Sequence, residues 1–153
     1  MQFIHPKSNV EGDVSLADGV SVWPFASIRG DEGLISIGKN TNIQDNVTIH
    51  GSLEIGDNVT IGHGAVVHGK KIGNNVLIGM NSTILHGVEV GDWCIVAAGA
   101  VIPPNTLIPE NSLLMGIPGK VARSLSSTDR DLIVSSCNEY LKKIRRIPEA
   151  TQK

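Results

Sequence analysis

The sequence predicts an all-β fold, a parallel β-helix of hexapeptide repeats, with one C-terminal α-helix packed alongside. A branched aliphatic residue recurs at every sixth position, small residues precede many of these by two, and Gly or Asn falls where tight turns are expected. A period of six fits neither an amphipathic helix nor an alternating strand. It fits a repeat in which each hexapeptide supplies one short strand and one turn.

The repeat runs through most of the chain with two changes of phase. Its aliphatic positions are Val10, Leu16, Val22, Ile28, Ile37, Ile43, Ile49, Ile55, Ile61, Val67, Ile72, Ile78, Ile84, Val90, Val96, Ile102, Ile108 and Leu114. Three residues are inserted between Ile28 and Ile37, and one is deleted between Val67 and Ile72. Three repeats close one triangular coil, so residues three repeats apart stack at roughly 4.8 Å, the spacing of paired strands. A chance period in a β-sandwich is the alternative interpretation.

The turns and the narrow inward positions follow the same period. Positive φ suits Gly and is tolerated by Asn. The Asn residues expected in such turns are Asn40, Asn46, Asn58, Asn75 and Asn81. One small inward position holds Cys94, which we expect to be a buried, hydrophobic thiol.

A helical spacing replaces the six-residue period towards the C-terminus. The stripe expected to pack on a flank of the β-helix consists of Leu132, Ser136, Tyr140 and Ile144, with Ile133 and Cys137 beside it. Ser127 or Thr128 is expected to cap the start of this helix. The sequence therefore predicts a hexapeptide-repeat domain over residues 1–122, with residues 123–153 as a C-terminal helix of the same domain.

Composition limits the expected partners and compartment. The net charge at pH 7 is −2, so neither nucleic acid nor an anionic membrane surface is an expected partner. We expect no membrane span, because no run is long or apolar enough, and no signal peptide, because MQFIHPKSNV lacks the apolar core of one. Cys94 and Cys137 form no motif, so we expect a reduced, cytoplasmic setting.

Two histidines are predicted to leave the same corner of the β-helix on adjacent coils. Ile49 and Val67 lie three repeats apart, and His50 and His68 follow them directly. Imidazoles placed in this way can converge on a metal at Zn–N distances of about 2.0–2.1 Å. His63 follows a strand of another face, so a neighbouring chain would have to bring it to that corner, at an interface repeated by rotational symmetry.

Three histidines with an open fourth position are the usual protein ligands of a catalytic zinc. The alternative is that each is a solvated turn residue. His86 lies beyond the deleted residue, which places Leu85 above His68, so His86 is not an expected ligand.

Three motifs carry a resemblance to a known family. The segments VWPFASIRGDEG, NIQDNVTIHG and IGHGAVVHG, together with the period of six, resemble the gamma-class carbonic anhydrases. The resemblance covers nearly the whole chain and implies a left-handed β-helix, a homotrimer and a metal at each subunit interface. It implies that His50, His63 and His68 are the metal ligands.

The same resemblance implies further roles. Arg29 and Asp31 match residues that join subunits, and Asp45 matches the carboxylate that pairs with this arginine across the interface. Gln44 matches a side chain beside the metal-bound water, and Glu32 matches a glutamate near the metal. A last candidate is Tyr140, which aligns with a helix tyrosine that reaches the site in some relatives; packing is its alternative role.

The implied function is reversible hydration of CO2 to bicarbonate by a metal-bound hydroxide. Zinc, iron and cobalt all suit three imidazoles. One departure is that His50 is followed by GSLEIGDN, without the acidic loop that carries a proton-shuttle glutamate in the best-studied type, so the chain resembles the short-loop branch. The alternatives are a hexapeptide-repeat acyltransferase that uses acyl-CoA, a trimeric scaffold without catalysis, and a metal-dependent hydrolase.

Overall fold

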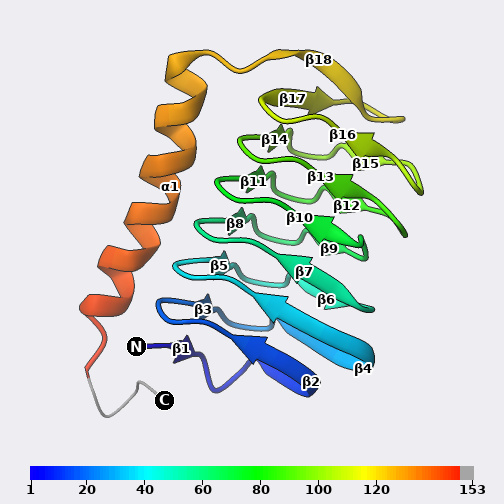
Figure 1. Ribbon diagram of the computed structural model, residues 1–153. Helices are drawn as coiled ribbons and strands as arrows, with labels where there is room; N and C mark the ends of the chain where they lie inside the picture. Colours follow the sequence, from blue (N-terminus) through cyan, green and yellow to red (C-terminus); the bar gives the residue numbers. More distant parts are fainter. Residues whose placement is uncertain (149–153) are drawn as a thin grey trace.

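The computed structural model describes residues 1–148 and shows a stack of parallel coils with one helix along its side (Figure 1). The elements are β1 (Phe3–Ile4), β2 (Asn9–Leu16), β3 (Ser21–Val22), β4 (Ser27–Ile37), β5 (Asn42–Ile43), β6 (Thr48–His50), β7 (Leu53–Ile55), β8 (Thr60–Ile61), β9 (Val66–Val67), β10 (Lys71–Ile72), β11 (Leu77–Ile78), β12 (Thr83–Ile84), β13 (Glu89–Val90), β14 (Ile95–Val96), β15 (Val101–Ile102), β16 (Leu107–Ile108), β17 (Ser112–Met115), β18 (Lys120–Ser124) and α1 (Ser127–Arg145). The predicted parallel β-helix with a C-terminal helix is confirmed.

The coils pair as the repeat predicts. One sheet has the order β1-β3-β5-β8-β11-β14-β17-β18 and the other β15-β12-β9-β6-β4-β7-β10-β13-β16, with β2 beside β4. Strand β4 passes round a corner, because its first part pairs with β6 and its last part with β7.

The two phase changes appear directly in the strand register. Thr48 pairs with Val66, an offset of 18 residues (66 − 48). Across the insertion Ser27 pairs with Thr48, an offset of 21 (48 − 27), and across the deletion Val66 pairs with Thr83, an offset of 17 (83 − 66). The insertion and the deletion both fall in corner segments, so the aliphatic repeat residue of each strand still points into the core.

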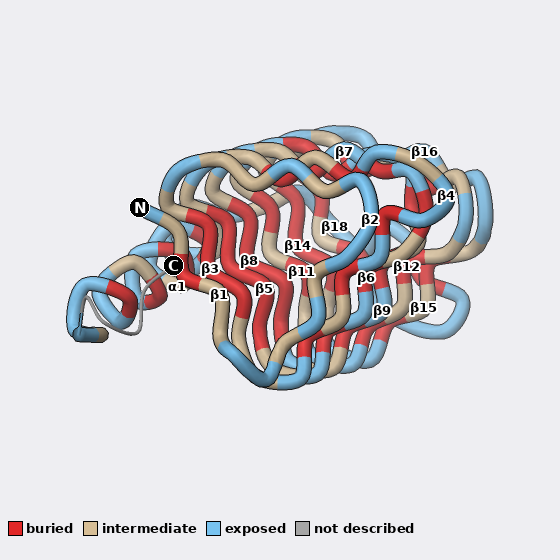
Figure 2. The backbone as a smooth tube through the Cα atoms, turned by 90° about the horizontal axis from the view of Figure 1, so that it is seen from below, coloured by how far each residue is buried: buried red, intermediate tan, exposed pale blue. Residues whose placement is uncertain are grey.

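The predicted aliphatic positions form the core. From Val22 to Leu114 each is at most 4% exposed, and Figure 2 shows the buried positions lining the coils seen from below. Val10 and Leu16 are only partly buried, because the first coil has no coil beneath it. Cys94 is fully buried, as predicted, and burial raises the pKa of its thiol.

The predicted asparagine turns are confirmed. Positive φ angles between 55° and 61° occur at Asn40, Asn46, Asn58, Asn75 and Asn81. Phe25 and Trp93 adopt the same conformation, which the sequence did not predict. Lys7 lies over the Phe25 ring and Arg130 over the Trp93 ring, so each bulky turn residue has a cationic partner.

The end of the stack departs from the parallel pairing of the other coils. Strand β18 turns back and pairs antiparallel with β17. This hairpin covers an edge that would otherwise expose unpaired backbone groups, which is how natural proteins protect the end of a sheet.

The start of α1 also differs from the prediction, because its N-cap is Ser126 rather than Ser127 or Thr128. Ser126 and Asp129 form a reciprocal capping box. Asp129 also pairs with Arg123 of β18, and the hydrogen bonds from Arg123 and Ser126 hold the pKa of Asp129 far below its ordinary value. The capping box is therefore also tied to β18 through Arg123.

The packed face of α1 combines Tyr140 and Ile144 of the predicted stripe with Ile133 and Cys137, which were expected beside it. The buried residues are Ile133, Cys137, Tyr140 and Ile144, whereas Leu132 is 50% exposed. The helix lies beside the sheet that contains β8 (Figure 1). Residues 149–153 of the predicted 123–153 segment lie outside the described residues. Within residues 1–148, no helix is long and apolar enough to span a bilayer.

Candidate metal centre

His50 and His68 stack on one corner of the β-helix. His50 ends β6 and His68 follows β9, and the pairing of Ile49 with Val67 sets them one coil apart. Their ring centroids are 5.2 Å apart and the planes differ by 16°. The sequence prediction that these two side chains share a corner on adjacent coils is confirmed.

Glu32 joins these two histidines. It lies in the insertion of β4, close to Arg29, which is level with His50 in the strand register. Glu32 Oε1 is 3.7 Å from His50 Nε2, and Glu32 Oε2 is 4.0 Å from His68 Nε2. One donor atom from each of the three residues lies within 4.8 Å of the others. Imidazole nitrogen and carboxylate oxygen are ordinary ligands of zinc, iron and cobalt, so this donor set fits a divalent metal ion.

Asp31 touches only one of the two histidines. Its Oδ1 is 2.9 Å from His50 Nε2, the nitrogen that also faces Glu32. Desolvation raises the pKa of Asp31, but the hydrogen bond of its own backbone N–H and the charge of Arg29 lower it more, so the net pKa lies below the ordinary value. Asp31 therefore occupies, in this chain, the same His50 nitrogen that a metal ion would need.

Gly51 makes the stacking of the two imidazoles possible. A Cβ atom on Gly51 would lie 2.9 Å from Cδ2 and 3.1 Å from Nε2 of His68, and the residue has a φ of +110°. Any side chain here would displace the His68 ring and strain the backbone. Sequence analysis did not single out this residue; a glycine directly after a candidate ligand was the available signal.

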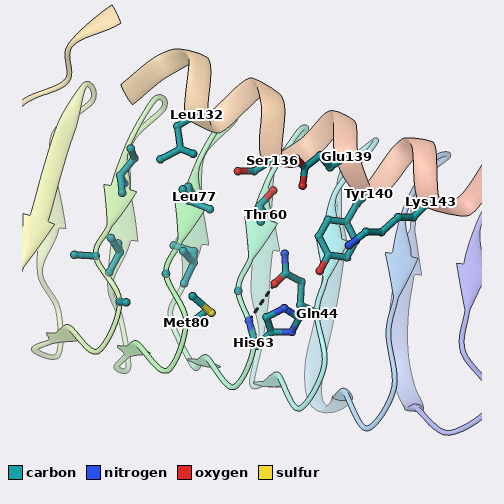
Figure 3. Close-up of a pocket in the computed structure, with 17 residues that line it drawn as sticks. Gln44, Thr60, His63, Leu77, Met80, Leu132, Ser136, Glu139, Tyr140 and Lys143 are labelled. Carbon is teal, nitrogen blue, oxygen red and sulfur yellow. Dashed lines mark hydrogen bonds between the residues drawn. The ribbon is translucent and has the colours of Figure 1, made fainter. Parts of the chain in front are cut away.

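His63 lies elsewhere, after β8 of the other sheet. Its Nδ1 is 3.2 Å from Asp45 Oδ1, and its backbone N–H donates to Gln44 Oε1 at 3.2 Å (Figure 3). Gln44 Nε2 in turn donates to Asn42 Oδ1 at 3.1 Å. Among the described residues, the donor cluster contains Glu32 and the other two histidines but not His63.

A cavity of about 520 Å³ opens beside His63 and is bounded on one side by α1. Gln44, His63 and Tyr140 face it together (Figure 3). Tyr140 also packs edge-to-face on Trp23 with centroids 5.3 Å apart, so it both packs and lines the cavity. Burial, followed by the negative charges of Asp45 and Glu139, raises the pKa of the Tyr140 hydroxyl.

Two sequence expectations have separate outcomes. In this chain Asp45 contacts His63, and the expected pairing of Asp45 with Arg29 across an interface stays a prediction.

The strand register places Leu85 level with His68, as expected, because Ile84 pairs with Val67. The ring of His86 nevertheless lies 6.1 Å from that of His68, although His86 is outside the donor cluster found among the described residues.

Asn42 is a second residue that sequence reasoning missed. It is 1% exposed, and its Nδ2 donates to Thr60 Oγ1 at 2.8 Å while its Oδ1 accepts from Gln44. These bonds fix which end of the Gln44 amide meets the His63 backbone. The available signal in the sequence was the polar Asn42 directly before the aliphatic repeat position Ile43.

Comparison with known proteins agrees with this architecture. The model for bacterial transferase hexapeptide (six repeats) matches residues 35–69 and 69–104. A crystal structure of a hexapeptide transferase family protein from Anaplasma phagocytophilum superposes with a TM-score of 0.83 at 27% identity, covering 94% of this chain and 91% of that one.

Curated relatives are more similar in sequence. Gamma carbonic anhydrase 2, mitochondrial, of Arabidopsis thaliana is 38% identical over 149 residues, covering 91% of this chain and 54% of that protein. The chain thus spans about half the length of this relative. Carnitine operon protein CaiE of Escherichia coli is 40% identical over 131 residues, covering 83% of this chain and 67% of that protein. The chain therefore belongs to the hexapeptide-repeat β-helix family that contains the gamma carbonic anhydrases and the CaiE proteins.

Proposed function

We propose that the protein is a metal-dependent, gamma carbonic anhydrase-like enzyme that hydrates CO2 reversibly to bicarbonate at the interfaces of a homotrimer. One observation carries this proposal. His50 and His68 point to one corner, whereas His63 lies on the other sheet beside Gln44. Rotational symmetry would bring the His63 side of one chain to the His50 and His68 corner of its neighbour, and would repeat the site at every interface.

The chemistry of the donors supports a catalytic metal. Three imidazoles leave a coordination position open for a water molecule. A zinc, iron or cobalt ion held there would lower the pKa of that water towards about 7, which supplies hydroxide at neutral pH.

Gln44 is placed to orient the reactants. Its Oε1 accepts from the His63 backbone and its Nε2 donates to Asn42, which leaves one amide proton and one lone pair for a bound water or substrate. The neighbouring cavity wall includes Leu77, Met80 and Ile95, an apolar surface suited to CO2. Buried hydrogen bonds keep the amide in one orientation, so no reorganisation is needed during the reaction.

A proton must leave the site in each cycle. The Glu32 side chain is 59% exposed and lies beside both histidines of the corner. In the absence of an acidic loop after His50, Glu32 is a carboxylate that faces both histidines of the corner and solvent, whereas Asp31 contacts His50 alone. We propose that it passes the proton to buffer.

Stopped-flow CO2 hydration on zinc-, iron- and cobalt-loaded protein is the test. The expected result is a hydration rate above that of buffer for at least one metal, with the metal-free protein as control. A rate equal to buffer for all three metals would remove CO2 hydration and leave a scaffold, a hydrolase or an acyltransferase. An acyl-CoA assay on the metal-free protein separates the last of these, because acyl transfer on this fold needs no metal at that corner.

A further inference from the structure

We propose that Trp23 is a positioning residue for Tyr140: its indole, backed by Phe3, holds the tyrosine ring in the wall of the cavity beside Gln44. The inference rests on the proposed function, because it takes this cavity as the place where the reactants lie. Among the described residues that line the cavity, Tyr140 is present and Trp23 is not. Any effect of Trp23 on the reaction would therefore pass through Tyr140.

The strand register places Trp23 at the lower end of the column that lines the cavity. Trp23 follows β3, Gln44 follows β5 and Gly62 follows β8, and these strands lie side by side in one sheet (Figure 1). The strands pair in register, so the three residues lie level on successive coils. Gln44 and Gly62 line the cavity. Gly62 has no side chain to fill the space above Gln44, whereas the indole of Trp23 fills the space below it.

Phe3, Trp23 and Tyr140 form one aromatic stack that links β1 to α1. The ring centroids of Phe3 and Trp23 are 5.0 Å apart, and those of Trp23 and Tyr140 are 5.3 Å apart with planes at 80°. Edge-to-face packing is a preferred and directional contact between aromatic rings. Phe3 is 2% exposed, so the ring behind the indole is itself held by the core. Trp23 therefore sets the plane in which the Tyr140 ring lies.

A buried hydrogen bond fixes the indole. Trp23 Nε1 donates to Ser21 Oγ at 3.0 Å, and Ser21 is 1% exposed, so rotation of the indole would leave a buried hydroxyl without its partner. Lys143 Nζ lies over the Tyr140 ring, 4.2 Å from its centroid. Figure 3 shows the hydroxyl end of Tyr140 directed towards Gln44. Held in this way, the hydroxyl offers one donor and one acceptor to a molecule in the cavity.

The placement of Tyr140 can be measured without activity, because it is the one tyrosine in the sequence. Incorporation of 3-fluorotyrosine gives a single fluorine NMR signal, and its shift between H2O and D2O reports how far the ring is exposed. Tyr140 is 8% exposed, so we expect a small solvent shift in the wild type. Trp23→Leu should raise this shift towards that of free 3-fluorotyrosine, whereas Trp23→Phe, which keeps a ring, should stay close to the wild type.

Trp93→Leu is the matched control for the fluorine measurement. Trp93 also lies against α1, where Arg130 covers its ring, but it has no part in the stack around Tyr140. Its removal should leave the solvent shift unchanged. An unchanged shift in Trp23→Leu, or an equal rise in Trp93→Leu, would overturn the positioning role.

A double-mutant cycle on CO2 hydration tests whether Trp23 acts through Tyr140. Tyr140→Phe is expected to lower kcat/KM about 5-fold, the effect of losing one neutral hydrogen bond. Trp23→Leu should lower kcat/KM by a similar factor and should cause no further loss in the Tyr140→Phe background. Wild-type kcat/KM in Tyr140→Phe, or a loss from Trp23→Leu that persists in that background, would overturn the inference. A wild type without hydration activity would instead contradict the proposed function, and the fluorine signal would still decide the placement of the ring.

Discussion

Replacing His50 and His68 together with alanine is expected to abolish metal binding and to reduce CO2 hydration to the rate of buffer. These two imidazoles stack on one corner and are two of the three proposed ligands, with His63 supplied by a neighbouring chain. Without them only Glu32 of the described donor cluster remains, and one carboxylate does not supply the three protein ligands of a catalytic zinc site. Metal content after dialysis and stopped-flow hydration measure the two effects.

His86→Ala is the matched control for this double variant. The His86 ring lies 6.1 Å from that of His68 on the same corner, yet it is outside the donor cluster. Its removal should leave the metal content at about one ion per site. Stoichiometric metal in the double variant, or loss of metal in His86→Ala, would contradict the ligand assignment.

Ile61→Ala is expected to lower the free energy of unfolding by about 2–5 kcal/mol. Ile61 is fully buried, and the register stacks it between Ile43 of the coil below and Ile78 of the coil above. The hydrogen-bonded coils cannot move together to fill the space, so the variant retains a cavity. Urea unfolding at one fixed protein concentration measures the change, because stability of an oligomer depends on concentration.

Leu107→Ala is the control for the core variant. Leu107 precedes a buried strand position but is 70% exposed, so truncating it should change stability by no more than about 0.5 kcal/mol. An Ile61→Ala protein as stable as Leu107→Ala would mean that the inward stack is not what holds the coils together.

Much of the fold follows from period alone. A six-residue repeat leaves one inward position per strand, so the offsets of 18, 21 and 17 residues could be counted from the sequence before the pairing was seen. The closing hairpin of β17 and β18 could not be counted, because it breaks the repeat. The cap at Ser126 could have been found in the sequence, because Ser126 and Asp129 have the spacing of a capping box.

The candidate site was likewise only partly predictable from the sequence. The stacking of His50 on His68 was predictable because each directly follows a core residue of the repeat. The reach of Glu32 to both imidazoles was not, since it depends on the course of inserted residues that have no period. The bond between Asp45 and His63 and the orientation of Gln44 were likewise set by side-chain packing that no spacing encodes.

Metal content in mixed trimers tests most directly whether the site is shared between subunits. Two chains, His63→Ala and His50→Ala, are each combined with Glu32→Gln so that neither homotrimer keeps enough ligands, and are refolded together in equal amounts. An interface regains all three histidines only when the His63→Ala chain supplies His50 and His68 and the other supplies His63. We expect zinc in about a quarter of the sites, because one ordered pairing in four is complete. No recovery of zinc, in samples that mass spectrometry proves to be mixed trimers, would contradict a centre built from two subunits.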